Sequence, residues 1–236
     1  FADQAVIAIE NVRLFNELEK RNRDITESLE QQTATSEILR VIASSPTDIQ
    51  PVLDVIAHFA ARLCDTPDSA VYQSDGEVLD LVAQNNFTPE GIAEIRRSYP
   101  RPLTREGGVS ALAILDRMVY HIPDVDNDPR LPELTRRFIQ ANGHKSLLFV
   151  PMLREGNAIG ALAVATHEPK TFSEKQIKLL QTFASQAVIA IENVRLFTET
   201  QRLLKETEQR AAELAIINSV QEGLASKLEM QAIYDL

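Results

Sequence analysis

Apolar residues recur every three or four positions along two long stretches of the chain, residues 4–44 and 176–222, which contain no glycine or proline. Good helix formers such as Glu, Gln, Leu, Arg and Ala dominate both stretches. These spacings place the apolar residues along one narrow side of a helix, as in a heptad repeat. We therefore predict a long helix in each stretch, with an apolar seam too narrow to stabilise an isolated helix.

A narrow apolar seam implies a partner helix, and the simplest partner is the same helix of a second chain. We predict a parallel homodimer through residues 4–40 and 176–220. The alternative is that each helix packs only on its own domain. The seam residues that we expect at the dimer interface are Phe15, Leu18, Ile25, Leu29, Val194, Phe197, Leu204 and Ala211.

Between the two stretches, short apolar segments alternate with turns rich in Gly, Pro, Asn and Asp. Asp75-Gly76 and Gly156-Asn157 are hairpin signals. The order of the segments predicts an α+β fold, with one antiparallel sheet, the terminal helices on one face and the middle helices on the other. The predicted helices lie at 51–64, 91–99, 109–117 and 133–141, and the predicted strands at 69–74, 78–83, 118–122, 146–153 and 158–166.

The beginning of the chain is repeated almost unchanged near its other end. Residues 1–15 read FADQAVIAIENVRLF and residues 183–197 read FASQAVIAIENVRLF. We infer a tandem array of similar modules, of which this chain is a fragment. The predicted division is 1–34 for the end of a preceding module and a helical linker, 35–197 for one complete domain, and 198–236 for a second linker and the start of the next module.

Composition narrows the classes of protein to consider. The 236 residues have a formal net charge of −10, which argues against a nucleic-acid partner, because phosphate binding needs clustered Lys and Arg. The apolar runs are much shorter than the roughly 20 residues of a membrane span, so we expect no membrane contact and a cytoplasmic location. A single Cys excludes a disulfide scaffold and a Cys-rich zinc site.

Residue types that carry chemistry are sparse, and we expect no enzyme, metal or cofactor. The four histidines have no ligand spacing, and His144 and His167 are expected to be exposed next to turns. The acidic run that begins at Asp124 fails the Ca²⁺ loop pattern, because Pro129 occupies the place of the required glycine. Gly107-Gly108 is not followed by the Lys-Ser/Thr of a phosphate-binding loop.

Three segments resemble a known family. The closing helix, FSEKQIKLLQTFASQAVIAIENVRLF at 172–197, is similar to the last helix of GAF domains. The strand pair SLLFVPML at 146–153 and NAIGALAV at 157–164 also resembles that family, as does VYHIPDVDNDP at 119–129. The resemblance implies a six-stranded antiparallel sheet, a parallel dimer through the flanking helices, and a small-molecule pocket on the other face of the sheet.

The same resemblance suggests how the chain works. It implies a regulatory sensor module that binds an unidentified small molecule, or relays a signal as a dimer, to a downstream output domain such as a histidine kinase of a two-component system. The alternative is a structural spacer with a filled pocket. Bilin attachment is not expected, because Cys64 lies at the end of the first helix, away from the pocket. The residues expected to line the pocket are Tyr72, Ser110, His121, Asp124, Arg130 and Arg137.

Overall fold

The computed structural model describes residues 10, 12–22, 25, 26, 29, 32, 33, 36, 40, 48–129 and 131–234, apart from the side chains at 222 and 224–234. The predicted antiparallel sheet is confirmed, with six strands in the order β3-β2-β1-β6-β5-β4. For the elements predicted between residues 51 and 166, the observed bounds lie within two residues of the predicted ones. The last helix instead continues to Tyr234, past its predicted end at residue 222, and β3 lies in a segment predicted only to be extended. The strands are β1 (Asp68–Ser74), β2 (Val78–Asn85), β3 (Arg101–Pro102), β4 (Tyr120–Ile122), β5 (Ser146–Arg154) and β6 (Asn157–Thr166).

Two tight hairpins set the register of the central strands. In the β1–β2 turn the Asp75 carboxylate accepts hydrogen bonds from the backbone N–H groups of Glu77 and Val78, at 2.9 and 2.8 Å. In the β5–β6 turn, Glu155 and Gly156 both have positive φ values, 50° and 81°, as the favoured two-residue hairpin turns require. The predicted turn at Gly156-Asn157 is therefore wrong by one residue, because Asn157 already belongs to β6.

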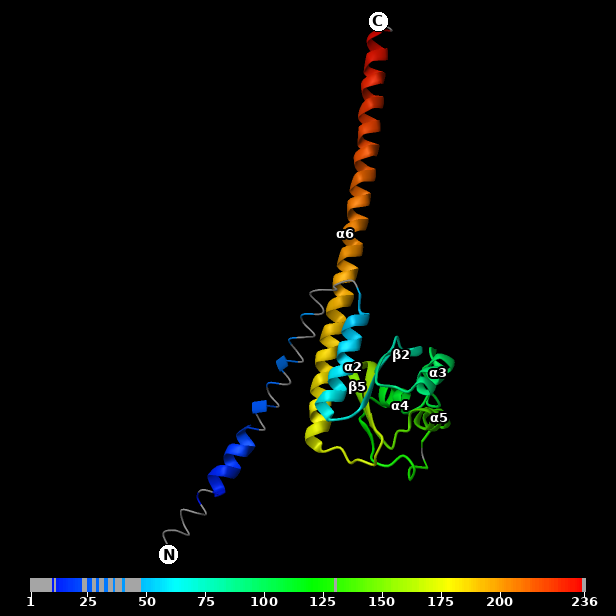
Figure 1. Cartoon of the computed structure of the whole chain (residues 1–236). Coiled ribbons are helices and arrows are strands. Elements are labelled where there is room, and N and C mark those ends of the chain that lie inside the picture. The colour runs from blue at the N-terminus through cyan, green and yellow to red at the C-terminus, as the bar shows by residue number, and fades with distance from the viewer. Residues whose placement is uncertain are drawn as a thin grey trace, which may run out of the picture.

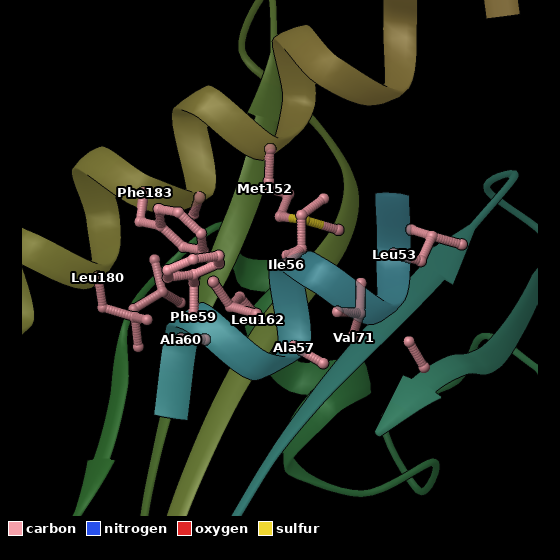
Figure 2. Packing of buried hydrophobic residues seen from close by; sticks show 14 of the residues in the cluster. Leu53, Ile56, Ala57, Phe59, Ala60, Val71, Met152, Leu162, Leu180 and Phe183 are labelled. Atoms are coloured by element: carbon pink, nitrogen blue, oxygen red, sulfur yellow. The ribbon is translucent and has the colours of Figure 1, made fainter. Parts of the chain in front are cut away.

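Two helices cover one face of the sheet, α2 (Gln50–Cys64) and α6 (Glu174–Tyr234), which lie side by side (Figure 1). Large side chains of α2 such as Ile56 and Phe59 interdigitate with Leu180 and Phe183 of α6 (Figure 2). The strands complete this core with residues that point to the same face, such as Leu162 of β6. The prediction that the terminal helices share one face is confirmed.

Three shorter helices, α3 (Pro89–Ser98), α4 (Val109–Asp116) and α5 (Glu133–Asn142), cover the opposite face. Side chains alternate between the two faces along each strand. On β5, Leu148 and Val150 belong to the core under α2 and α6, whereas Leu147 and Phe149 belong to the core under the shorter helices. Both faces of the central strands are therefore buried.

The long helix α6 begins with the predicted cap and continues far beyond the domain (Figure 1). The Ser173 hydroxyl accepts a hydrogen bond from Gln176 N–H at 3.2 Å, and the Gln176 side chain accepts one from Ser173 N–H at 3.0 Å. The helix contains 61 residues, a length of about 90 Å. From Leu196 to Val220 its apolar side chains are exposed.

The predicted seam residues fall into two groups. Val194 is 3% exposed and packs in the core of its own domain, so its assignment to the dimer seam is wrong. The physical reason is that α6 turns this residue toward α2 and the sheet before the helix leaves the domain. The other seam residues are exposed, namely Phe15, Leu18, Ile25, Leu29, Phe197, Leu204 and Ala211.

We predict that Leu180→Ala lowers the free energy of unfolding by about 2–5 kcal/mol, because it leaves a cavity between α6 and α2. Leu180 is completely buried in that core. Leu153→Ala is the matched control, since Leu153 is 42% exposed at the end of β5, and its effect should stay below about 1 kcal/mol. Urea unfolding followed by circular dichroism measures both. Equal losses for the two variants would show that α6 is not part of the domain core.

Candidate functional site

A cavity of about 40 Å³ lies between the sheet and the three shorter helices. Strands β1, β5 and β6 form its floor, and α3, α4 and α5 contribute its walls. Most of its lining is apolar or aromatic, which is typical of small-molecule sites. The apolar lining includes Phe87, Val109, Phe138, Leu147, Phe149, Ala163 and Ala165.

Arg101 brings a positive charge to this cavity. It lies on β3 opposite Leu79 of β2, and residues paired across strands point to the same face. Its Nη2 donates a 2.8 Å hydrogen bond to the Tyr99 hydroxyl and also contacts the Gly107 carbonyl oxygen. The guanidinium carbon lies 4.2 Å from the centre of the Tyr99 ring. Among the described residues, Nε and Nη1 are buried without a hydrogen-bond partner.

Two tyrosines and a serine line the cavity together with Arg101. The Tyr99 hydroxyl lies 3.4 Å from the Ser110 hydroxyl, and the Tyr72 and Tyr99 rings are 5.8 Å apart. Burial raises the pKa of both phenols above the ordinary tyrosine value, although the Arg101 charge opposes the shift. Both hydroxyls are therefore neutral near pH 7, and neither neutralises Arg101.

The backbone before α4 approaches Arg101 closely because Gly108 has no side chain. Its φ of +90° lies in the region that favours glycine. A β-carbon at this position would lie 2.9 Å from the Thr135 hydroxyl and 3.4 Å from Nη2 of Arg101. The Thr135 hydroxyl accepts a 3.0 Å hydrogen bond from the N–H of Val109, the first residue of α4. This pair fixes α4 to α5 beside the cavity.

One carboxylate lines the cavity, and it already has cationic partners. Glu94 of α3 forms a 2.6 Å ion pair with Arg137 of α5 and a longer one of 3.8 Å with Arg97. It also accepts a hydrogen bond from the Ser98 hydroxyl at 3.1 Å. Its side chain is only 9% exposed, whereas Arg137 reaches it from the half-exposed surface of α5. These contacts join α3 to α5 at the rim.

A second polar cluster is centred on Asp68, at the start of β1. One carboxylate oxygen lies 2.9 Å from His144 Nε2 and 2.7 Å from His167 Nε2, and the other accepts a 2.8 Å hydrogen bond from Asn86. Burial by itself raises the pKa of Asp68, but the hydrogen bonds from His144 and Asn86 and the charges of both histidines together lower it. His144 lines the cavity, and in the described structure its Nδ1 has no partner.

Comparison with known proteins identifies the fold and the family. The family model described as "GAF domain" matches residues 48–191, which is more than half of the chain. The chain belongs to the GAF domain family. This GAF domain contains the described cavity, and α6 extends beyond it. A search of the curated proteins finds no significant match.

Solved structures of similar fold come from signalling proteins and from an enzyme. Residues 122 to 287 of a methyl-accepting chemotaxis protein are 25% identical, with a TM-score of 0.52, and the match covers 69% of this chain and 97% of that one. A domain of a putative two-component sensor histidine kinase from Sinorhizobium meliloti 1021 is 17% identical, with a TM-score of 0.51 and coverages of 63% and 93%. Free methionine-R-sulfoxide reductase from Neisseria meningitidis is 20% identical, with a TM-score of 0.53 and coverages of 70% and 90%.

The GAF cavity brings together only some of the residues that the sequence suggested. Tyr72 and Ser110 line it, and Arg137 reaches its rim through Glu94. His121 does not line it, because this position of β4 points to the opposite face, where its Nε2 accepts a 3.1 Å hydrogen bond from Phe172 N–H. Asp124 does not line it either and organises its own loop through Asp126 N–H and Asn127. Arg130 lies outside the described residues.

Sequence reasoning missed the residues that give the cavity its charge. Arg101 lies between two prolines, Pro100 and Pro102, in a segment expected only to be extended. The available signal for Arg101 as a site residue was a cationic side chain in a segment whose backbone is restricted by the two flanking prolines. The expectation that His144 is exposed is wrong, since it is 2% exposed and pairs with Asp68, 76 residues away in sequence.

No group of three or more His, Cys, Asp or Glu side chains among the described residues is arranged to hold a metal ion. None of the helices described combines the length and the apolar character of a membrane span. The single Cys64 is the last residue of α2 and is buried, and burial raises the pKa of its thiol to about 12.

We predict that Asp68→Asn lowers the free energy of unfolding at pH 7 by about 1–3 kcal/mol, because it weakens a buried hydrogen-bonded cluster. The folded-state pKa of Asp68 is lower than its unfolded value of about 3.9. Its stabilisation is therefore fully present above about pH 4 and is lost as the pH falls through the folded-state pKa.

Urea unfolding of both proteins between pH 2.5 and pH 7 measures this effect, and the difference between them should shrink as the pH falls below about 4. Asp126→Asn is the control, because the Asp126 side chain is 62% exposed in its 2.7 Å pair with Lys145, and its effect should not exceed about 1 kcal/mol. A wild-type-to-variant difference that is independent of pH would contradict the assignment.

Proposed function

We propose that the chain is a regulatory sensor module that binds a small molecule in the cavity and relays the bound state through α6. The observation that carries the proposal is that the cavity and α6 lie on opposite faces of the same strands. The relatives in chemotaxis and sensor-kinase proteins support a regulatory role at the level of the family.

The central strands offer a short physical route from the cavity to α6. On β6, Ala163 and Ala165 line the cavity, whereas their neighbour Leu162 does not and packs in the core under α2 and α6. A ligand that displaces a strand by a fraction of an ångström displaces both sets of side chains. Packed cores respond to such shifts by changing between discrete arrangements, so α6 can change its packing without a direct contact with the ligand.

We further propose that α6 pairs with its counterpart in a parallel homodimer and passes the signal to an output domain in the same chain, such as a histidine kinase. Exposed Phe197, Leu204 and Ala211 recur at intervals of seven residues on the part of α6 that leaves the domain. The near repeat of residues 1–15 at 183–197 supports a tandem array in which such helices connect successive modules.

The alternative function, a structural spacer without a ligand, would fit a face of the sheet that side chains fill completely. The observed face instead contains a cavity with a charged group on its wall. The GAF family is mainly regulatory, although one relative of similar fold is a reductase. Cys64 is not among the residues that line the cavity of this chain.

We predict that Leu204→Lys weakens the dimer, because it places a charge in an apolar seam. Sedimentation velocity should show at least a tenfold increase in the dissociation constant. Gln209→Lys is the control, since Gln209 is exposed and lies on the other side of α6 from the repeat that contains Leu204 and Ala211. A wild-type chain that remains monomeric at tens of micromolar would overturn the dimer proposal.

A ligand screen tests the sensor proposal directly. We expect at least one compound from a panel of neutral and charged metabolites to raise the melting temperature by about 2–8 °C at a large excess over its dissociation constant. The same compound should change hydrogen exchange in α6 after Phe197. Ala165→Leu fills the cavity and should abolish both effects. If no compound stabilises the wild-type chain, or if α6 exchange does not respond to a bound compound, the spacer alternative is favoured.

A further inference from the structure

We propose that the cavity binds a short-chain monocarboxylate, with the carboxylate group next to the guanidinium of Arg101 and the alkyl chain against the apolar wall. This inference rests on the proposed function only in taking the cavity as a ligand site. It adds the chemical class of the ligand, and it assigns Arg101 as the residue that selects that class.

The first argument is the incomplete hydrogen bonding of Arg101. A guanidinium group has five N–H donors and no acceptor. Nη2 has partners in the Tyr99 hydroxyl and the Gly107 carbonyl group. Within the described residues Nε and Nη1, which carry the other three N–H donors, are shielded from solvent and have no acceptor. Buried donors without acceptors are rare and costly, and a ligand acceptor that reached them from the cavity, which Arg101 lines, would remove that cost.

The second argument is charge. Each carboxylate near the cavity is already engaged: Glu94 with Arg137 and Arg97, and Asp68 with His144 and His167. The phenols next to Arg101 are neutral because burial raises their pKa values. The acceptors that contact Arg101 within the described structure are a hydroxyl and a carbonyl group, both uncharged. An anionic ligand would supply the missing charge through strong charge-assisted hydrogen bonds.

The third argument sets the size and valence of the anion. A volume of about 40 Å³ corresponds to about three water molecules, which suits a ligand of four to six non-hydrogen atoms. Val109, Leu147 and Phe149 line the cavity as apolar surface, which favours an alkyl chain and disfavours a strongly hydrated divalent anion. One unneutralised arginine matches one negative charge. Acetate, propionate and butyrate have these properties.

The test compares ligands that differ in one property, using isothermal titration calorimetry and thermal shift at pH 7 and constant ionic strength. We expect propionate to bind at least tenfold more tightly than propionamide, its neutral analogue of the same shape. Sulfate should bind at least tenfold more weakly than propionate, and hexanoate should be excluded by its length. Equal binding of propionate and propionamide by the wild-type chain would overturn the proposal without any variant.

Variants then identify the residue. Arg101→Gln should weaken propionate binding at least tenfold, and Arg101→Lys should restore part of it because the charge returns. Arg105→Gln removes the same charge from an exposed position paired with Asp116 and should leave binding unchanged. If Arg101→Gln and Arg105→Gln bind propionate as the wild-type chain does, Arg101 does not select the ligand and the proposal is wrong.

Failure of this inference is separable from failure of the proposed function. If a neutral metabolite binds in the cavity and changes α6 exchange while carboxylates do not bind, the sensor function stands and the ligand class is wrong. If propionate binds through Arg101 but leaves α6 unchanged, the ligand class stands and the relay is wrong. If the screen and the carboxylates both give no binding, the two proposals fail together.

Discussion

The structure depends on a sheet that is buried on both faces. Strands β1, β6 and β5 lie at its centre, with α2 and α6 on one side and α3, α4 and α5 on the other. A strand in this position needs apolar side chains in both directions. This requirement explains the uninterrupted apolar runs of β5 and β6. It also means that only the sheet separates the cavity from α6, the helix that leaves the domain.

The two faces differ in the size of their side chains, and this difference produces the cavity. On β6, Leu162 and Val164 fill the face under α2 and α6, whereas Ala161, Ala163 and Ala165 occupy the face under the shorter helices. Close packing tolerates few voids, so the space above the alanines must be filled from the helices or remain open. Polar groups such as Arg101 and Glu94 reach into that region, and part of the space remains open as the cavity.

The sequence predicted the elements well and their long-range contacts poorly. Hairpin turns, the Ser173 cap and the division of helices between two faces depend on neighbouring residues or on simple periodicity, and all are recognisable in one sequence. The contact between His144 and Asp68, and the position of Arg101 beside the cavity, depend on strand pairings between distant segments. Val194 shows a further limit, because the same heptad spacing describes a residue in the domain core and one in the exposed helix. Periodicity predicts which side of a helix is apolar. Whether that side is covered by the domain or exposed depends on where the helix leaves the domain, which periodicity does not show.

The part of α6 that leaves the domain has few structural contacts of its own. Its stabilising interactions include i,i+3 and i,i+4 ion pairs of Arg202 with Glu199 and Glu206, at 2.7 and 2.9 Å, and such exposed pairs contribute only tenths of a kcal/mol each. The hydroxyls of Thr200 and Thr207 bond back to helix carbonyls at 2.8 Å, at places where leucine would strengthen a coiled coil. A helix with so little intrinsic stability takes its conformation from whatever it packs against. A small free-energy difference is therefore enough to change how this part of α6 packs, which is a physical condition for the relay proposed above.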